Sequence, residues 1–347
     1  MPLPRLLLAD RVKGEQDSFL RPLLPALRCA YDVRFVSLPP GQALAAAIAE
    51  ADVVWLEWCW DHAVWATTSG VLAGRPCVLR LHSIEALQTD FPARVDWRQV
   101  HRLVVVGGDI AALLASRFPA VAGSVRIELV ANGIDTARFA PGAPDRFRIG
   151  WVGHVEPKKN PMLLLQIAHR LRQADARYTI HAAGAFTDLR TLRYLQHAVP
   201  ALGLGDVVRF EGAVADMPAW YADKGVLVST SMYESFGMAI GEAMAVGAFP
   251  VVHDFPGAAD LWPPECLFLA TDDAVALIRS ARPGLYRDWV TERYGLERQE
   301  RDVLRVLEEV TFSALRRSRS AGLSRDADQC EMRSVGGEGD RVGAAHL

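Results

Sequence analysis

Two acidic side chains lie close to the predicted start of a helix in the second half of the chain. Glu234 belongs to a short polar loop, and Glu242 belongs to the helical pattern that follows it. Chemistry alone gives these carboxylates two explanations. They stabilise a helix N-terminus through its dipole, by about 0.3–1 kcal/mol, or they bind hydroxyl groups of a ligand whose phosphate occupies that N-terminus. A sugar and a ribose would supply such hydroxyl groups.

The residues around these glutamates predict the element that must position them. The apolar runs 225–229 and 248–252 are typical of buried strands, and the pattern 237–246 between them is typical of a helix. A strand–loop–helix–strand unit of this kind builds parallel sheets. At the N-terminus of such a helix, free backbone N–H groups form a natural anion site. The N–H groups concerned are those of Phe236, Gly237 and Met238.

The string ESFGMAIGEAMAVG, which begins at Glu234, resembles the nucleotide-sugar site of retaining glycosyltransferases of family 4, which have the GT-B fold. The resemblance implies that Glu234 contacts the donor sugar and that Glu242 holds the ribose hydroxyl groups. It also implies that the Phe-Gly region meets the pyrophosphate. The further donor-binding residues predicted from this stretch are Ser231, Ser235, Phe236, Gly237 and Met238.

The composition excludes several other classes of protein. The chain has 347 residues, half of them hydrophobic, which allows two domains with ordinary cores. A net charge of −3 does not favour a nucleic-acid partner. Five scattered cysteines indicate neither a disulfide framework nor a zinc site, and they suit a reducing compartment. With no signal sequence and no membrane-spanning run, we expect a cytoplasmic protein, and peripheral membrane contact is left open.

Each half of the chain alternates apolar runs with helical patterns, which is typical of a doubly wound parallel sheet. No G-x-G-x-x-G string follows a strand, so a dinucleotide-dependent oxidoreductase is not favoured. The pattern therefore predicts an α/β protein with two Rossmann-like domains that face each other across a cleft, and the resemblance implies that this fold is of the GT-B type. The predicted strands are Leu6–Ala9, Val33–Ser37, Val53–Leu56, Cys77–Leu81, Leu103–Val106, Arg126–Val130, Phe147–Val152, Tyr178–Ala183, Val207–Phe210, Gly225–Ser229, Ala248–Val252 and Leu267–Ala270.

Changes in composition mark the domain boundaries. The segment Ala131–Arg146 contains an Asn-Gly turn and two prolines, and resembles the family's connection between domains. Glu292–Val310 has the spacing of a terminal helix, and the polar composition after Arg316 predicts disorder. The resemblance further implies that the first domain takes the acceptor, that the second takes the donor, and that the last helix crosses back to the first. We therefore expect an acceptor-side domain (1–140), a donor domain (141–295), a helix (296–315) that packs back on the first domain, and a disordered tail (316–347).

A second stretch, GHVEPKKNP from Gly153, joins a predicted strand to a predicted helix with Asn160 as its N-cap. Lys158 and Lys159 oppose the helix dipole there, which indicates either a bound anion or a solvated basic loop. The stretch resembles a family motif in which the lysine at position 159 binds phosphate; Gly153 and Lys158 are then donor-binding. His154 replaces the usual arginine, which is permanently charged, and so predicts weaker or pH-dependent turnover.

The carboxyl ends of the strands predict the other site residues. Leu81-His82 resembles a family motif whose histidine lies over the donor sugar, although a lone histidine is more often structural. Gly212 and Val214 match the base-binding region. Candidate acceptor contacts are Asp10, Arg11, Glu57 and Arg80. Tryptophans around Glu57 have two explanations, stacking on an acceptor or core packing.

The resemblance implies transfer of a sugar, with retention, from a nucleoside diphosphate sugar (UDP or GDP) to a hydroxyl group of a glycan, lipid-linked or small-molecule acceptor. Glu234, His82, Lys159 and His154 are the predicted catalytic residues. No cofactor or metal is expected, since the Asp-x-Asp string of this chain, at 326–328, lies in the predicted tail. Two alternatives remain. One is a degenerate GT-B protein that binds nucleotide sugar or supports a partner subunit, and the other is a nucleotide-sugar epimerase.

Overall fold

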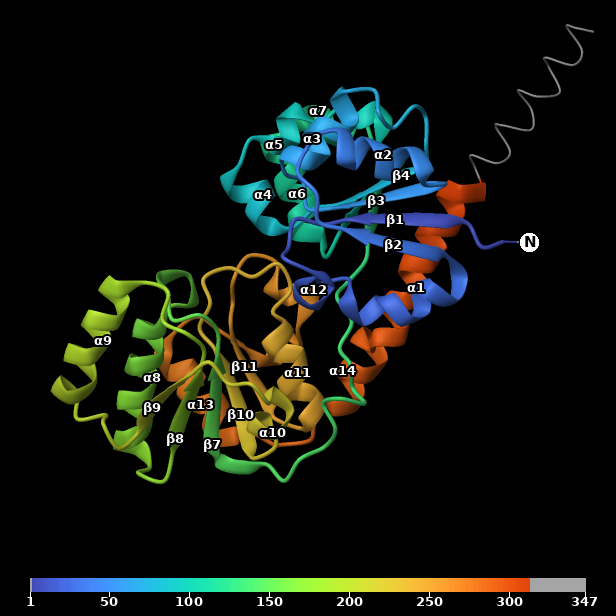
Figure 1. Cartoon of the computed structure of the whole chain (residues 1–347). Coiled ribbons are helices and arrows are strands. Elements are labelled where there is room, and N and C mark those ends of the chain that lie inside the picture. Colours follow the sequence, from blue (N-terminus) through green and yellow to red (C-terminus); the bar gives the residue numbers. More distant parts are fainter. Residues whose placement is uncertain (1, 313–347) are drawn as a thin grey trace, which may run out of the picture.

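The computed structural model describes residues 2–312 and contains two parallel sheets of six strands each (Figure 1). The first sheet has the order β2-β1-β3-β4-β5-β6. Its strands are β1 (Arg5–Ala9), β2 (Asp32–Val36), β3 (Val53–Glu57), β4 (Cys77–Arg80), β5 (Arg102–Val105) and β6 (Ile127–Leu129). The second sheet has the order β12-β11-β10-β7-β8-β9. Its strands are β7 (Asp145–Val152), β8 (Thr179–Ala183), β9 (Val208–Gly212), β10 (Lys224–Ser229), β11 (Phe249–His253) and β12 (Leu267–Phe268). Two α/β units of this kind confirm the predicted fold class.

Helices cover both faces of each sheet, which explains why the strands are nearly continuous apolar runs. In β1 the side chains alternate between faces. Leu7 and Ala9 join one buried cluster, whereas Leu6 and Leu8 join another. The helices of the first half are α1 (Leu24–Ala30), α2 (Gln42–Glu50), α3 (Asp61–Thr68), α4 (Ser83–Gln88), α5 (Phe91–Arg94), α6 (Gly108–Arg117) and α7 (Pro119–Ala122). Those of the second half are α8 (Pro161–Ala174), α9 (Leu189–Ala201), α10 (Met217–Tyr221), α11 (Met238–Val246), α12 (Ala258–Leu261), α13 (Thr271–Ser280) and α14 (Arg287–Tyr294).

The terminal helix differs from its prediction as one continuous element over Glu292–Val310. α14 ends at Tyr294, Gly295 is extended, and a new helix runs over 296–312. The interruption arises because Gly295 forms a β-bridge with Ile134 of the segment that joins the two halves. The backbone N–H of Ile134 donates to the carbonyl of Tyr294 at 2.7 Å, and that of Leu296 donates to the carbonyl of Ile134 at 3.0 Å.

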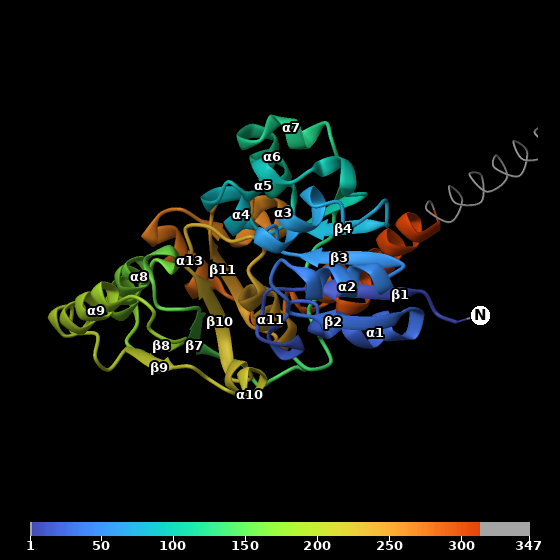
Figure 2. The ribbon, with the colours of Figure 1, turned by 45° about the horizontal axis from the view of Figure 1, so that its top comes forward.

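After this bridge the helix 296–312 returns to the first sheet and covers one of its faces (Figures 1 and 2). Its buried apolar side chains are Val303, Val306, Leu307 and Val310, which pack in one cluster with Leu6, Leu8, Trp55 and Val104. The last described helix and α1 therefore together cover this face of the first sheet. The predicted tail 316–347, with its Asp-x-Asp string, lies outside the described residues, as do the last residues of the predicted helix 296–315.

Candidate functional site

A cavity of about 620 Å³ lies at the carboxyl ends of the strands, and both halves of the chain line it. Ligands of doubly wound sheets bind at this edge. The lining residues of the first half are Phe19, Trp58, Trp60, His82, Ser83, Ile84 and Asn132. Those of the second half are Val152, Gly153, Lys158, Lys159, Leu227, Val228, Ser229, Glu234, Ser235, Phe236, Gly237, Met238, Ala239, Ile240 and Glu242.

Among residues 2–312, Glu234 is one of two glutamates that line this cavity, and two lysines lie beside it. The Nζ of Lys159 donates to its Oε1, and the Nζ of Lys158 lies 4.0 Å from its Oε2. The hydroxyl of Ser231 also donates to Oε1, at 2.7 Å. The structure thus brings together predicted residues that are about 75 positions apart in the chain. The arrangement offers one carboxylate for hydroxyl groups and two cations for a phosphate.

Neighbouring backbone contacts hold the lysine loop in place. The hydroxyl of Thr230 donates to the carbonyl of Lys159 at 2.7 Å, and the N–H of Met232 donates to the carbonyl of Lys158 at 2.9 Å. Gly153 matters for space, because a Cβ there would lie 3.0 Å from Cδ of Lys159. Asn160 caps α8 as predicted, since its side chain accepts from the N–H of Leu163 at 3.3 Å. The loop is therefore fixed at both ends.

The N-terminus of α11 opens onto the same cavity. Gly237 is its N-cap, with φ 92°, a conformation that favours glycine. Because glycine has no side chain, it leaves the N–H groups of the first turn for a ligand. The ring of Phe236 is buried against Trp262 and Tyr294, so the side chain of this predicted donor-binding residue anchors the loop.

Glu242 lies one turn further along α11, where it also lines the cavity. The hydroxyl of Tyr221 donates to its Oε2 at 3.3 Å. Burial raises the pKa of the Glu242 carboxyl, although the Tyr221 hydrogen bond and the charge of Arg138 act in the opposite direction. A carboxylate in this setting gains from a hydroxyl donor, as a ribose would provide.

In the first half, His82 follows β4 and lines the cavity. Its Nε2 lies 2.8 Å from Oε1 of Glu57, and its ring stacks on Trp58 with 3.9 Å between ring centroids. Burial lowers the pKa of His82, and Glu57 opposes that shift in part. The net effect favours the neutral imidazole.

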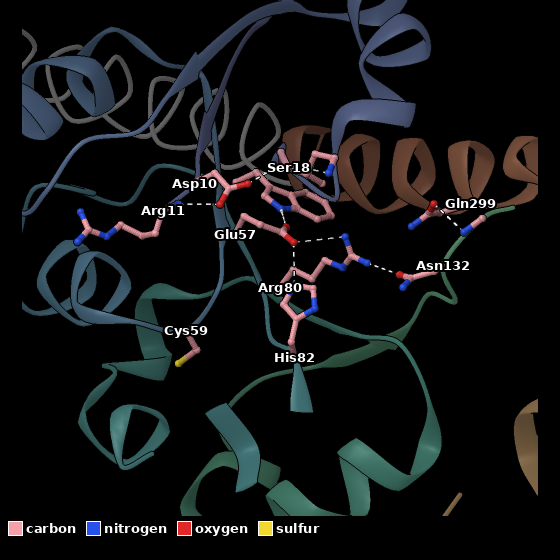
Figure 3. A network of polar contacts seen from close by, with 12 residues as sticks. Asp10, Arg11, Ser18, Glu57, Cys59, Arg80, His82, Asn132 and Gln299 are labelled. Carbon is pink, nitrogen blue, oxygen red and sulfur yellow. Dashed lines mark hydrogen bonds and ion pairs between the residues drawn. The ribbon is translucent and has the colours of Figure 1, made fainter. Parts of the chain in front are cut away.

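The structure contradicts the prediction that Glu57 and Arg80 contact an acceptor. Glu57 is 0% and Arg80 2% exposed. The two residues are register partners at the ends of β3 and β4, and Nη1 of Arg80 lies 3.3 Å from Oε1 of Glu57. Nη2 of Arg80 donates to the side-chain oxygen of Asn132, and Nε1 of Trp55 donates to Oε2 of Glu57 at 2.8 Å (Figure 3). The polar atoms of Glu57 and Arg80 are therefore bonded to other protein groups, and neither residue lines the cavity.

Asp10 is a second correction among the predicted acceptor contacts. It is 1% exposed, and it accepts from the hydroxyl of Ser18 and the N–H of Arg11, each at 2.6 Å (Figure 3). Burial raises the pKa of this carboxyl. Nε of Arg11 lies 3.3 Å from Oδ1 of Asp61. Neither Asp10 nor Arg11 is among the residues that line the cavity.

Four other predicted residues also lie outside the lining set, and one of them, Ser231, still bonds to Glu234. The other three lie elsewhere at the edge of the second sheet. His154 is exposed just after β7, Gly212 ends β9, and Val214 follows it half-buried. The carbonyl of Gly212 accepts from the N–H of Gly184 at 2.7 Å. All three belong to the carboxyl edge of the second sheet, where their roles in donor binding stay predictions.

Sequence reasoning missed several lining residues of the first half. Phe19, Ser83, Ile84 and Asn132 carry no motif of their own, although Asn132 belongs to the Asn-Gly turn of the connection. Of the tryptophans, Trp58 and Trp60 line the cavity. Trp55 is instead buried in the first sheet, and Trp65 packs against the core. Both explanations of that cluster thus apply, to different members.

Direct hydrogen bonds join the two halves next to the cavity. The hydroxyls of Ser235 and Ser83 are bonded to each other, and the hydroxyl of Tyr233 donates to Asp109 at 2.7 Å. Asp109 lies in the first turn of α6. Within residues 2–312, no group of three or more histidine, cysteine, aspartate or glutamate side chains is placed to hold a metal ion, and no helix is long and apolar enough to cross a membrane.

Residues 133–265 match the family model described as "Glycosyl transferases group 1". The D-inositol 3-phosphate glycosyltransferase of Salinispora arenicola is 32% identical over 179 residues, which cover 44% of this chain and 39% of that relative. The lipopolysaccharide core biosynthesis mannosyltransferase LpcC of Rhizobium leguminosarum bv. viciae is 28% identical, over 45% of this chain and 48% of LpcC. The chain thus matches less than half the length of these curated relatives.

Solved structures extend the similarity to the first half. The crystal structure of Anabaena Alr3699/HepE in complex with UDP and glucose has a TM-score of 0.70 at 17% identity, and covers 88% of this chain and 100% of that chain. The lipopolysaccharide outer core galactosyltransferase WaaB has a TM-score of 0.66 at 13% identity, over 88% of this chain and 99% of WaaB. The chain has the GT-B fold of these glycosyltransferases, and its residues 133–265 resemble the glycosyl transferases of group 1.

Proposed function

We propose that the protein transfers a sugar, with retention of configuration, from a nucleoside diphosphate sugar to a hydroxyl group of an acceptor. The observation that carries this proposal is the group formed by Glu234, Lys159, the N-terminus of α11 and Glu242 around one cavity. The names of the relatives above support sugar transfer, and the bound UDP of the Anabaena protein supports a uridine or similar nucleotide. In this proposal the second half holds the donor and the first half receives the acceptor.

The geometry suggests a role for each residue. Lys158, Lys159 and the first N–H groups of α11 would hold the diphosphate and stabilise the charge that develops on it as the sugar leaves. Glu242 would accept hydrogen bonds from the ribose, and Glu234 from the sugar.

In the transfer step, the bond between the anomeric carbon and the phosphate oxygen breaks, and a bond from the acceptor oxygen forms on the same face. The acceptor proton passes to the departing phosphate. His82 lines the same cavity as Glu234 and would contact the reacting sugar. We include no metal ion, because the lysines and the helix N-terminus supply positive charge. We place the reaction in the cytoplasm, where cysteines such as Cys29 remain free thiols, as they are in residues 2–312.

Protection against thermal unfolding tests this proposal. UDP, GDP, ADP and dTDP, with their sugars, would be added with and without EDTA. A ligand at 100 times its Kd stabilises the folded state by about 2.7 kcal/mol. We expect one nucleotide to protect, with no effect of EDTA, and we expect Glu242→Ala to abolish the protection. Failure of every nucleotide to protect would contradict the proposal.

One observation favours a second function, a GT-B protein that binds nucleotide sugar without transferring it. His154 stands where the family has a phosphate-binding arginine, and its side chain is exposed and outside the lining set. This alternative predicts nucleotide protection without hydrolysis or transfer of the donor. His154→Arg would then increase nucleotide affinity, whereas a competent transferase shows turnover with histidine in place.

A further inference from the structure

We propose that Glu57 is a positioning residue that fixes the ring of His82 and its tautomer, so that Nδ1 of His82 accepts a hydrogen bond from a hydroxyl group in the cavity. This inference rests on the proposed function for the identity of that hydroxyl, which would belong to the transferred sugar or the acceptor. Figure 3 shows the network that carries it.

The side chain of Glu57 contacts protein donors on both oxygens. Oε1 lies 2.8 Å from Nε2 of His82 and 3.3 Å from Nη1 of Arg80, and Oε2 accepts from Nε1 of Trp55 at 2.8 Å. The side chain is 0% exposed. Burial raises the pKa of Glu57, but the charge of Arg80 and the hydrogen bonds from His82 and Trp55 outweigh it, so that its net pKa lies below the usual value. Glu57 is thus a buried, ionised carboxylate that holds three donors.

The ionised state of Glu57 determines which ring nitrogen of His82 carries a hydrogen. An ionised carboxylate has no hydrogen to donate, so Nε2 of His82 must carry the hydrogen between them. Burial also favours the neutral form of His82, because it lowers the pKa of that ring. A neutral imidazole with hydrogen on Nε2 has its lone pair on Nδ1. The network therefore selects one tautomer of a residue that lines the cavity.

Stacking on Trp58 fixes the orientation of the His82 ring. His82 stacks on Trp58, with 3.9 Å between ring centroids and an angle of 27° between the planes. Trp58 itself has φ 74°, a rare conformation for a bulky residue that persists where the surroundings hold it. Its N–H donates to the carbonyl of Arg80 at 3.0 Å, and the N–H of Cys59 donates to Glu85 at 2.8 Å. The ring of His82 is thus clamped between the carboxylate of Glu57 and a fixed aromatic plane.

Nuclear magnetic resonance of the full chain labelled with ¹⁵N-histidine tests the tautomer without donor or acceptor. We expect His82 to carry hydrogen on Nε2, with a downfield, slowly exchanging Nε2–H resonance, and a lone pair on Nδ1. Hydrogen on Nδ1 of the unmodified protein would overturn the proposal. This result does not depend on the folding of any variant.

Glu57→Gln provides the second arm. An amide has one acceptor atom, so it cannot satisfy Trp55, Arg80 and His82 together. We expect the Nε2–H resonance to move upfield or vanish. We also expect kcat/KM for sugar transfer to fall roughly tenfold to a hundredfold, the effect of losing a hydrogen bond to a charged group. Nucleotide protection should persist, since Glu57 is fully buried and is not among the residues that line the cavity.

Glu128→Gln is the matched control, because Glu128 is another buried glutamate of the first half and pairs with Arg102 at 3.3 Å and Arg126 at 2.8 Å, not with His82. It should leave the His82 resonances and transfer unchanged. If Glu57→Gln also leaves both unchanged, Glu57 does not position His82. If the unmodified protein binds no nucleotide, the proposed function fails, while the histidine spectrum still decides the role of Glu57.

Discussion

The two halves of the molecule use charged residues at the carboxyl ends of their strands in opposite ways. In the second half Glu234 and Lys158 remain 12% and 46% exposed at their side chains and face the cavity. In the first half Glu57 and Arg80 are 0% and 2% exposed and face each other. The charges of the second half are therefore available to a ligand. The charges of the first half instead bond to each other and hold His82 and the neighbouring tryptophans in place. A charged residue at a strand end thus contacts ligand where it stays partly exposed, and supports the fold where it is buried and paired.

Arg80→Met should have the largest effect, because it leaves the Glu57 carboxylate buried without its cation. Breaking a buried ion pair in this way costs about 3–5 kcal/mol of unfolding free energy. Denaturant unfolding measures the loss. The matched change in the second sheet is Arg148→Met, whose partner Asp223 lies 2.9 Å away in an exposed pair. That variant should lose about 1 kcal/mol or less. Equal losses would remove the contrast between the halves.

Lys159→Ala comes next and tests the second half. If the lysine stabilises the departing diphosphate, kcat should fall by roughly 10²–10³, as for other preorganised groups at a developing charge. Donor hydrolysis and transfer assays measure this loss. Unfolding free energy should change little, because the Lys159–Glu234 pair is partly exposed. A large loss of stability with normal kcat would show that the lysine is a scaffold residue like Arg80.

Glu85→Gln tests the first half through the pH dependence of its unfolding free energy. Burial raises the pKa of Glu85 to about 7 from its ordinary 4.5. The folded state thus holds this proton more tightly than the unfolded state, so its stabilising contribution is complete below pH 4.5 and is lost as pH rises to about 7. The loss amounts to about 3 kcal/mol at most. The variant should match the native protein at pH 4.5 and be more stable at pH 8, by chemical denaturation. If the variant and the native protein differ in stability by the same amount at both pH values, the raised pKa of Glu85 is contradicted.

Tyr233→Phe should give the smallest effect, since it removes one hydrogen bond between the halves. The hydroxyl of Tyr233 donates to Asp109 at 2.7 Å. Its loss should cost about 1 kcal/mol and shift the halves towards a more open arrangement. Small-angle X-ray scattering would detect an increased radius of gyration. An unchanged radius would show that the remaining contacts, such as Ser83 with Ser235, hold the closed form.

Much of the fold could be predicted because strand burial leaves a strong pattern. The twelve predicted apolar runs all contain strands, within a few residues. Short helices such as α5 and α12 were not predicted, since four residues carry no periodicity. The break at Gly295 also escaped prediction, because its cause is a bridge to Ile134, far away in sequence.

The candidate site, like the fold, has a part that local sequence predicts and a part that it does not. The cavity lining at Glu234, Glu242 and Lys159 followed from local motifs, because one loop and one helix start place them. Glu57 and Arg80 were assigned to the acceptor, since a sequence does not reveal whether a strand end is covered. Their register, Glu57 opposite Arg80, held the missing signal. Two opposite charges at the same level of neighbouring strands predict a mutual pair.

The bridge at Gly295 has a mechanical consequence. The chain passes between the halves twice, once in the segment after β6 and once between α14 and the helix 296–312, and Ile134 and Gly295 join these two passages side by side. The N–H of Gly133 is also bonded to Gln299, at 2.8 Å. A single tether would let the halves swivel in any direction. Two passages that are hydrogen-bonded to each other restrict the rotation of one half against the other more than a single passage would, which favours the arrangement in which His82 and the lysines line one cavity.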